Sequence, residues 1–125
     1  MSQTTGTHYR WEAIPKERLT DDIERRFVHG ERVMVAQVFL KKGAVVPTHT
    51  HESEQVTYIL EGALRLWLGK EGEQDVTVNA GEILTIPSML PHRAEALDDT
   101  LDVDVFSPPR QDWIDKTDAY LRRGR

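Results

Sequence analysis

The sequence predicts an all-β barrel followed by a short C-terminal helix, and three observations lead to this expectation. Runs rich in Val, Ile, Leu and Thr recur at intervals of roughly ten residues from residue 23 onward. Glycine or asparagine separates the runs, as at Lys42-Gly43, Glu61-Gly62 and Asn79-Ala80-Gly81. Helical spacing of apolar residues occurs only near the C-terminus. Short strands at such spacing are typical of a sandwich or barrel.

Each expected strand is an apolar or alternating run bounded by turn residues. The expected strands cover residues 23–28, 33–40, 45–48, 55–60, 64–68, 74–78, 83–86, 92–96 and 101–106.

A single helix is expected after Pro108-Pro109, over residues 111–122. Apolar and aromatic side chains there fall at three- and four-residue steps, namely Trp113, Ile114, Thr117, Tyr120 and Leu121. The whole chain, 1–125, is expected to be one domain, with an N-terminal arm over 1–22, the barrel over about 23–107 and the helix packed outside it.

Composition excludes several classes of function. The formal charge of −5 argues against a nucleic-acid or anionic-membrane surface, and Arg122, Arg123 and Arg125 are expected to form a solvated tail. The chain has no cysteine, so disulfides and thiolate metal ligands are excluded. No apolar run approaches the ~20 residues of a membrane span, and we expect a cytoplasmic protein.

Three of the five histidines suggest a metal site. His49 and His51 are two residues apart, so in an extended strand both would point to the same face. Gln55 follows after three residues, and His92 lies further along the chain. Gln55 can either bind the metal or orient a histidine from outside the ligand set. Glu52 and Glu54 are expected to be solvated, and His8 and His29 to be ordinary surface residues.

The spacing resembles the two motifs of the cupins. The first motif corresponds to Gly43, five residues, His49-Thr50-His51, three residues, Gln55, six residues and Gly62; the second corresponds to Gly81, five residues, Pro87, four residues and His92. Met89 and Ala96 depart from the usual second motif, at positions that are not ligands in the family. The resemblance implies a jelly-roll-like barrel that holds one divalent transition metal (Zn, Ni, Fe, Mn or Cu) through His49, His51, Gln55 and His92.

The ligand set carries little charge, because three imidazoles and an amide replace the more usual set with a carboxylate. The metal would then be more electropositive, which favours Lewis-acid chemistry on an anionic substrate over redox work.

The last expected strand resembles a narrower group. Asp102, Asp104 and Phe106 alternate along one face, which is unusual for a core and natural for a lined cavity. Residues 104–110 are similar to the C-terminal signature of the pectin-degradation cupins, which convert 4,5-unsaturated uronates into linear keto sugars, and residues 54–62 and Pro91-His92 extend the likeness. The resemblance implies that Asp104, Phe106 and Arg110 line the pocket. Arg110 could instead form a salt bridge or cap the following helix.

The sequence therefore predicts a metal-dependent enzyme, similar to a sugar isomerase or tautomerase, that acts on an anionic sugar. A metal-dependent dioxygenase acting on a small organic molecule and a non-catalytic sugar-binding cupin remain alternatives. A homodimer is expected, because a second copy would cover the exposed edges that a small barrel leaves open.

Overall fold

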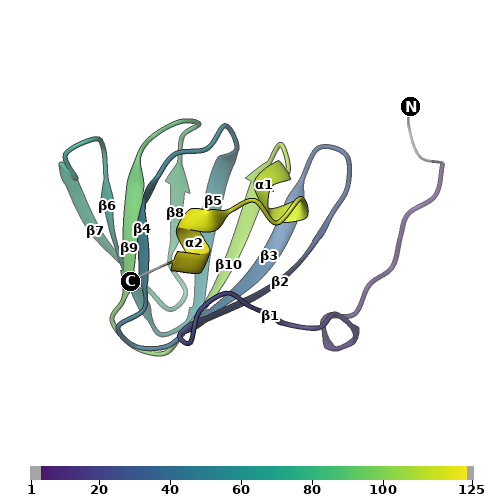
Figure 1. Cartoon of the computed structure of the whole chain (residues 1–125), viewed down its shortest axis with the longest axis horizontal. Helices are drawn as coiled ribbons and strands as arrows, with labels where there is room; N and C mark the ends of the chain where they lie inside the picture. Colours follow the sequence, from purple (N-terminus) through teal and green to yellow (C-terminus); the bar gives the residue numbers. More distant parts are fainter. Residues whose placement is uncertain (1–3, 124–125) are drawn as a thin grey trace.

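The computed structural model describes residues 4–123, which form two antiparallel sheets facing each other (Figure 1). The six-stranded sheet has the order β1-β2-β3-β10-β5-β8, and the four-stranded sheet has the order β4-β9-β6-β7. Their bounds are β1 Glu17–Arg18, β2 Ile23–His29, β3 Met34–Leu40, β4 Val45–His49, β5 Glu54–Glu61, β6 Ala63–Leu68, β7 Gln74–Asn79, β8 Ile83–Ile86, β9 His92–Ala96 and β10 Thr100–Ser107.

Buried and less buried residues alternate along the strands, and the buried residues of the two sheets form the interior. Along β3 every second side chain is buried, from Met34 to Leu40, and β6 buries Leu64, Leu66 and Leu68 from the opposite sheet. Each fully buried Leu or Val contributes about 1.5–3 kcal/mol relative to an exposed one. The inward face of β10 differs, because it carries the buried carboxyl groups of Asp102 and Asp104. The interior is therefore apolar on one side and polar along β10.

The all-β expectation is confirmed, and each of the nine expected strands is present, with ends that differ by a residue or so. One further strand, β1, was not expected. It consists of Glu17 and Arg18, which pair with Arg25 and Glu24 of β2. Two charged residues carry no apolar alternation, so no sequence pattern indicates this strand.

The expectation of a single helix over 111–122 is wrong. The segment forms two short helices, α1 (Gln111–Ile114) and α2 (Ala119–Arg123). Between them Lys116 takes a left-handed φ of 58°, and the Thr117 N–H donates to the Asp112 carbonyl at 2.8 Å. This is the hydrogen bonding of a helix-ending Schellman turn. The turn redirects the chain so that Asp118 reaches the buried Arg25.

The two helices lie over the barrel, and α2 packs near β4 (Figure 1). Neither of them has the length or hydropathy that a helix needs to cross a membrane.

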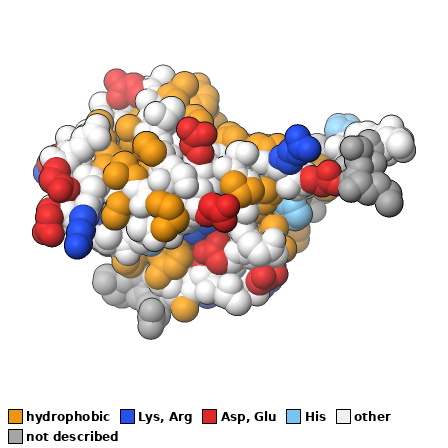
Figure 2. Space-filling view, turned by 90° about the horizontal axis from the view of Figure 1, so that it is seen from above, with side chains coloured by type: hydrophobic (Ala, Val, Ile, Leu, Met, Phe, Trp, Pro, Cys, Tyr) orange, Lys and Arg blue, Asp and Glu red, His pale blue; other side chains and the backbone are white. Residues whose placement is uncertain are grey.

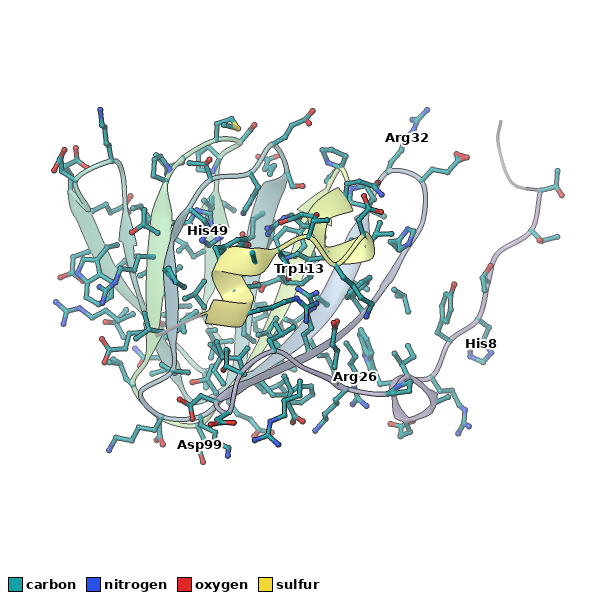
Figure 3. All side chains as sticks on the ribbon, in the orientation of Figure 1. His8, Arg26, Arg32, His49, Asp99 and Trp113 are labelled. Atoms are coloured by element: carbon teal, nitrogen blue, oxygen red, sulfur yellow. The ribbon has the colours of Figure 1, made fainter. Side chains whose placement is uncertain are left out.

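The N-terminal arm stands away from the body of the barrel, and His8 lies on it (Figures 2 and 3). Its anchor is a short 3₁₀ turn, η1 (Trp11–Ala13). Arg26 of β2 donates to the Trp11 carbonyl at 2.9 Å, and its guanidinium lies 5.7 Å from the centre of the Trp11 ring. Residues 4–10, which precede η1, are exposed.

Candidate metal centre and substrate cavity

Three histidines meet at one end of the barrel, two from neighbouring positions and one from more than forty residues further along the chain. His49 is the last residue of β4 and pairs in register with His92, the first residue of β9. His51 lies two residues beyond β4. One ring nitrogen from each histidine lies within 4.8 Å of the others. The ring centres of His49 and His92 are 4.2 Å apart, and those of His51 and His92 are 4.9 Å apart.

The expectation that His49 and His51 point to the same face of one strand is only partly right. His49 and His51 do converge, but they do not share a strand face, because β4 ends at His49. The loop carries His51 instead: its carbonyl accepts the Met89 N–H at 2.9 Å, and its Nδ1 lies 2.9 Å from the Ser53 carbonyl. The position of Met89, which departs from the usual motif, is thus part of the support for this loop.

Backbone carbonyls orient all three rings. The Nδ1 atoms of His49, His51 and His92 lie 2.9, 2.9 and 2.8 Å from the carbonyls of Pro47, Ser53 and Leu90. A carbonyl oxygen only accepts, so each Nδ1 carries the hydrogen and each Nε2 keeps its lone pair. The Nε2 of His92 is buried and has no hydrogen-bond partner among the described residues. Three inward lone pairs fit a bound cation.

Electrostatics keeps these imidazoles neutral. Burial, reinforced by the nearby His92, lowers the pKa of His49 to about 3. Burial, with the positive charge of Arg110, lowers the pKa of His51 to about 4. Burial also lowers the pKa of His92. Because only the neutral imidazole binds metal, the cluster is ready to do so at neutral pH.

Gln55 adds an amide oxygen to the same centre. This buried residue of β5 donates from Nε2 to Thr57 Oγ1 at 2.8 Å and to Asp104 Oδ1 at 3.4 Å. Its Oε1 therefore turns to the histidines and lies 3.0 Å from His51 Nε2. A neutral imidazole has one N–H, which His51 uses at Ser53, so two lone-pair atoms face each other here. A cation between them resolves this conflict, and the donor set fits a divalent metal.

A cavity continues from the histidines into the barrel. Two buried carboxyl groups of β10 line it, Asp102 and Asp104, and they are hydrogen-bonded to each other. Burial raises the pKa of both, and the charge of Asp104 raises the pKa of Asp102 further. Asp104 also accepts from Thr57 Oγ1 at 2.8 Å, which favours its ionised form. The shared hydrogen therefore belongs to Asp102, and Asp104 is the carboxylate.

Arg110 closes the cavity together with the C-terminal helices. It is buried, and it donates from Nε and Nη2 to the carboxylate of Asp112 at 3.1 and 2.9 Å, so the expected alternative of a salt bridge is also correct. It also donates to the Tyr120 hydroxyl. Its guanidinium lies 5.1 Å from the Phe106 ring centre, and the Phe106 ring lies edge-on to His51 at 5.7 Å.

Sequence reasoning missed Tyr120 as a residue of the site. Its ring stacks on His49 at 4.6 Å and lines the cavity from α2. The helical spacing of Tyr120 indicated packing, but no short motif indicates a contact with a histidine seventy-one positions earlier in the chain. Trp113, which the helical spacing also indicated only as a packing residue, lines the cavity too, and so does Arg25, for which the sequence carries no signal.

The remaining expectations about charged residues are mostly confirmed. Glu52, Glu54, His8 and His29 are exposed, and none of them belongs to the histidine cluster. The expected solvated tail is wrong for Arg122, whose side chain pairs with Glu17 and Asp118. The side chain of Arg123 and the whole of Arg125 lie outside the described part of the chain.

The fold and the histidine cluster define a barrel of the cupin class. The model of this family, described as a cupin domain, matches residues 36–107, and the chain belongs to it. No protein of curated function matches the chain by sequence.

Among solved structures, the chain is similar to KdgF from Halomonas sp., with a TM-score of 0.79, 30% identity, and coverage of 87% of this chain and 99% of the other. An RmlC-like cupin from Shewanella frigidimarina gives the same TM-score of 0.79 at 23% identity, covering 87% of this chain and 96% of that one. Oxalate decarboxylase of Bacillus subtilis, studied for its Mn(II) centres, shares the fold with a TM-score of 0.73 at 22% identity. The match covers 86% of this chain and 31% of the enzyme.

Proposed function

We propose that the protein is a metal-dependent enzyme that converts a 4,5-unsaturated uronate monosaccharide into its linear keto form. The observation that carries this proposal is the placement of Asp104 and Arg110 in one cavity with His49, His92 and Gln55, beside which His51 completes the histidine cluster. The likeness of residues 104–110 to the pectin-degradation cupins and the similarity to KdgF support the choice of substrate.

His49, His51, His92 and Gln55 would hold one divalent ion, for which Zn, Ni, Fe, Mn and Cu are all suitable with imidazole ligands. When bound, the ion supplies Lewis acidity toward a substrate oxygen.

Arg110 binds the substrate carboxylate. Asp112 and Tyr120 fix its guanidinium from one side, and Nη1 has no hydrogen-bond partner among the described residues. A guanidinium held this way presents its free N–H groups in a fixed direction, which suits a planar carboxylate. Phe106 and Tyr120 add ring surfaces that pack on the sugar and exclude water.

Asp104 moves the proton. In the reaction the bond between the anomeric carbon and the ring oxygen breaks, and the anomeric hydroxyl loses its proton as an aldehyde forms. The ring oxygen takes a proton and becomes an enol hydroxyl, which then becomes a ketone as a proton adds to the neighbouring carbon. These steps conserve atoms and need no oxidant. Thr57 and Gln55 orient Asp104, and burial raises its pKa toward the range in which a carboxyl group exchanges protons readily.

The test follows the ultraviolet absorbance of the unsaturated uronate with metal-replete and chelated protein. We expect the metal-replete protein to remove the band and the chelated protein to leave it at the uncatalysed rate. Asp104→Asn should keep its metal and fold but lose at least ~100-fold in kcat, a size typical for a proton-transfer group. Asp75→Asn, at an exposed carboxylate of β7, is the matched control. Absence of metal-dependent decay would refute the assignment, and a requirement for oxygen would favour a dioxygenase.

We also propose that two copies of the chain associate through the outer face of the six-stranded sheet. Large apolar side chains are exposed there, Tyr58 and Leu60 on β5 and Ile83 on β8, and the last is 62% exposed. The arm, with the exposed Tyr9, extends away from its own barrel and is available to a second copy (Figure 2). Light scattering after size exclusion should give twice the chain mass, and Tyr58→Glu with Ile83→Glu should shift it to one chain. A wild-type monomer at micromolar concentration would contradict this.

A further inference from the structure

The cavity has a second polar end, formed by Arg25 and Asp102. Both side chains are buried, and both line the cavity that contains His49 and His92. They also lie in one row across the six-stranded sheet, since Arg25 of β2 pairs with Val38 of β3, and Val38 pairs with Asp102 of β10. Neighbouring strands are about 4.8 Å apart, so the two Cα atoms are separated by about 10 Å, with Val38 between them.

Arg25 keeps one terminal NH₂ group of its guanidinium unused among the described residues. Its Nη1 donates to Asp118, its Nε donates to Glu17 at 3.3 Å, and its guanidinium lies 4.3 Å from the Trp113 ring centre. These contacts hold the group rigidly and compensate its charge. The remaining atom, Nη2, is buried without a hydrogen-bond partner among the described residues. Buried N–H groups are nearly always satisfied, so this one indicates a missing acceptor.

Asp102 presents the complementary atom. One of its oxygens shares the hydrogen bond with Asp104, while Oδ1 is buried and has no partner in the described chain. Asp102 and Arg25 both line the cavity, so its wall contains an acceptor and a donor that have no partner among the described residues. Asp102 lies two residues before Asp104 on the same inward face of β10.

We propose that Arg25 and Asp102 form a subsite that binds the hydroxyl groups of the sugar at the end of the cavity away from the histidines. A hydroxyl accepts one hydrogen bond and donates another, so it satisfies Nη2 and Oδ1 together, either alone or with its neighbour on the ring. A second carboxylate fits less well, because Asp118 and Glu17 already compensate Arg25 and the adjoining Asp102–Asp104 pair would repel an anion.

This inference rests on the proposed function. It assigns the sugar hydroxyl groups, which Arg110 and the histidine centre leave unbound, to Arg25 and Asp102. Arg110 and the histidine centre take the carboxylate and the reacting oxygen. The subsite then determines specificity, because a site built to bond a hydroxyl discriminates strongly against an analogue that lacks it. Ordered water filling the same two positions is the competing account.

The first test leaves the protein unchanged. Binding of galacturonate, which is saturated and cannot react by this route, is compared by calorimetry with binding of its 2-deoxy and 3-deoxy forms to the metal-replete protein. We expect at least one deoxy sugar to bind about tenfold more weakly, the loss expected when a buried pair of polar groups is left unmatched. Equal affinity for all three sugars would overturn the subsite. Turnover of the unsaturated uronate is measured separately, so a failure of the proposed reaction is distinguished from a failure of the subsite.

The second test uses Asp102→Leu, which keeps the side-chain size and removes both oxygens. Folding and metal content are checked first, by circular dichroism and elemental analysis. We expect KM for the unsaturated uronate to rise about tenfold and the preference among the deoxy sugars to disappear, while kcat falls as well because Asp104 loses its hydrogen bond from Asp102. A fall in kcat with unchanged KM would mean that Asp102 acts only through Asp104, and would contradict the proposal. Arg25→Lys, which keeps the charge beside Asp118 but removes Nη2, should change KM in the same direction.

Discussion

The two halves of the cavity wall are built in different ways. The histidine end is fixed by the backbone: His49 and His92 are paired residues of adjacent strands, and carbonyl groups orient each ring. The end formed by α1 and α2 is held by side-chain charges, through Arg25 with Asp118, Arg122 with Glu17, and Arg110 with Asp112. The geometry of the histidine cluster therefore depends on the strands and on the backbone contacts of the loop that carries His51, whereas the packing of the helices over the cavity depends on ion pairs. Changes at the two ends should affect different properties.

The largest effect on binding is expected from His92→Ala. This change removes one of the three inward lone pairs, and we expect metal content after dialysis to fall from about one ion per chain to near zero while the barrel stays folded. Elemental analysis and circular dichroism measure the two properties. His29→Ala, at an exposed histidine outside the cluster, should retain wild-type metal content. Full metal loading of His92→Ala would show that the cluster is not the metal centre.

The largest effect on stability is expected from Asp118→Ala. Arg25 and Asp118 are both fully buried, so the change leaves the buried Arg25 with only the longer, partly exposed contact to Glu17 as an ion pair. Breaking such a pair costs about 3–5 kcal/mol of unfolding free energy, measured by urea denaturation. Asp115→Ala, three residues earlier and exposed, is the control and should cost well under about 1 kcal/mol. If Asp118→Ala loses no more unfolding free energy than the control, the ion pair does not hold α2 against the barrel.

A smaller effect is expected from Tyr120→Phe. Tyr120 contacts both ends of the cavity, His49 at the histidine end and Arg110 at the helical end. The ring still stacks on His49, but the hydroxyl that accepts from Arg110 is lost. We expect unchanged metal content, a stability loss of about 1 kcal/mol and a several-fold higher KM, because Arg110 is less firmly oriented. Tyr58→Phe, at an exposed position of β5, is the control. A change in metal affinity with unaltered KM would place Tyr120 at the metal instead.

The smallest effect concerns acid stability at the helical end. Burial raises the pKa of Glu17, but hydrogen bonds from Arg122 and Lys116 outweigh it and lower the pKa to about 2. Because the unfolded chain binds this proton at higher pH than the folded chain, the contribution is complete above about 4.5 and is lost as the pH falls toward about 2. Glu17→Gln should therefore weaken the dependence of stability on pH in this range. An identical slope for the variant and the wild type would refute the role of Glu17.

The difference between the end of the cavity that is fixed by the backbone and the end that is held by ion pairs also explains which features the sequence could predict. The strands follow local patterns of alternation, and the proposed ligands His49, His51, Gln55 and His92 were indicated by their spacing; all four side chains converge in the structure. Asp104, Phe106 and Arg110 were recognised from a resemblance and lie in the cavity as expected. Arg25, Asp118 and Tyr120 could not be found this way, because their roles depend on partners far along the chain. The break between α1 and α2 has the same origin, since it serves the contact of Asp118 with Arg25.

The most direct test of the central claim, that the cavity performs a proton shift without redox chemistry, is turnover in heavy water under argon. Metal-replete protein is mixed with the unsaturated uronate, and the product is examined by mass spectrometry and nuclear magnetic resonance. The account predicts full turnover without oxygen and a linear keto sugar that carries one deuterium, in a single configuration, on the carbon beside the new ketone. Turnover that requires oxygen, or a product that has gained an oxygen atom, would contradict it.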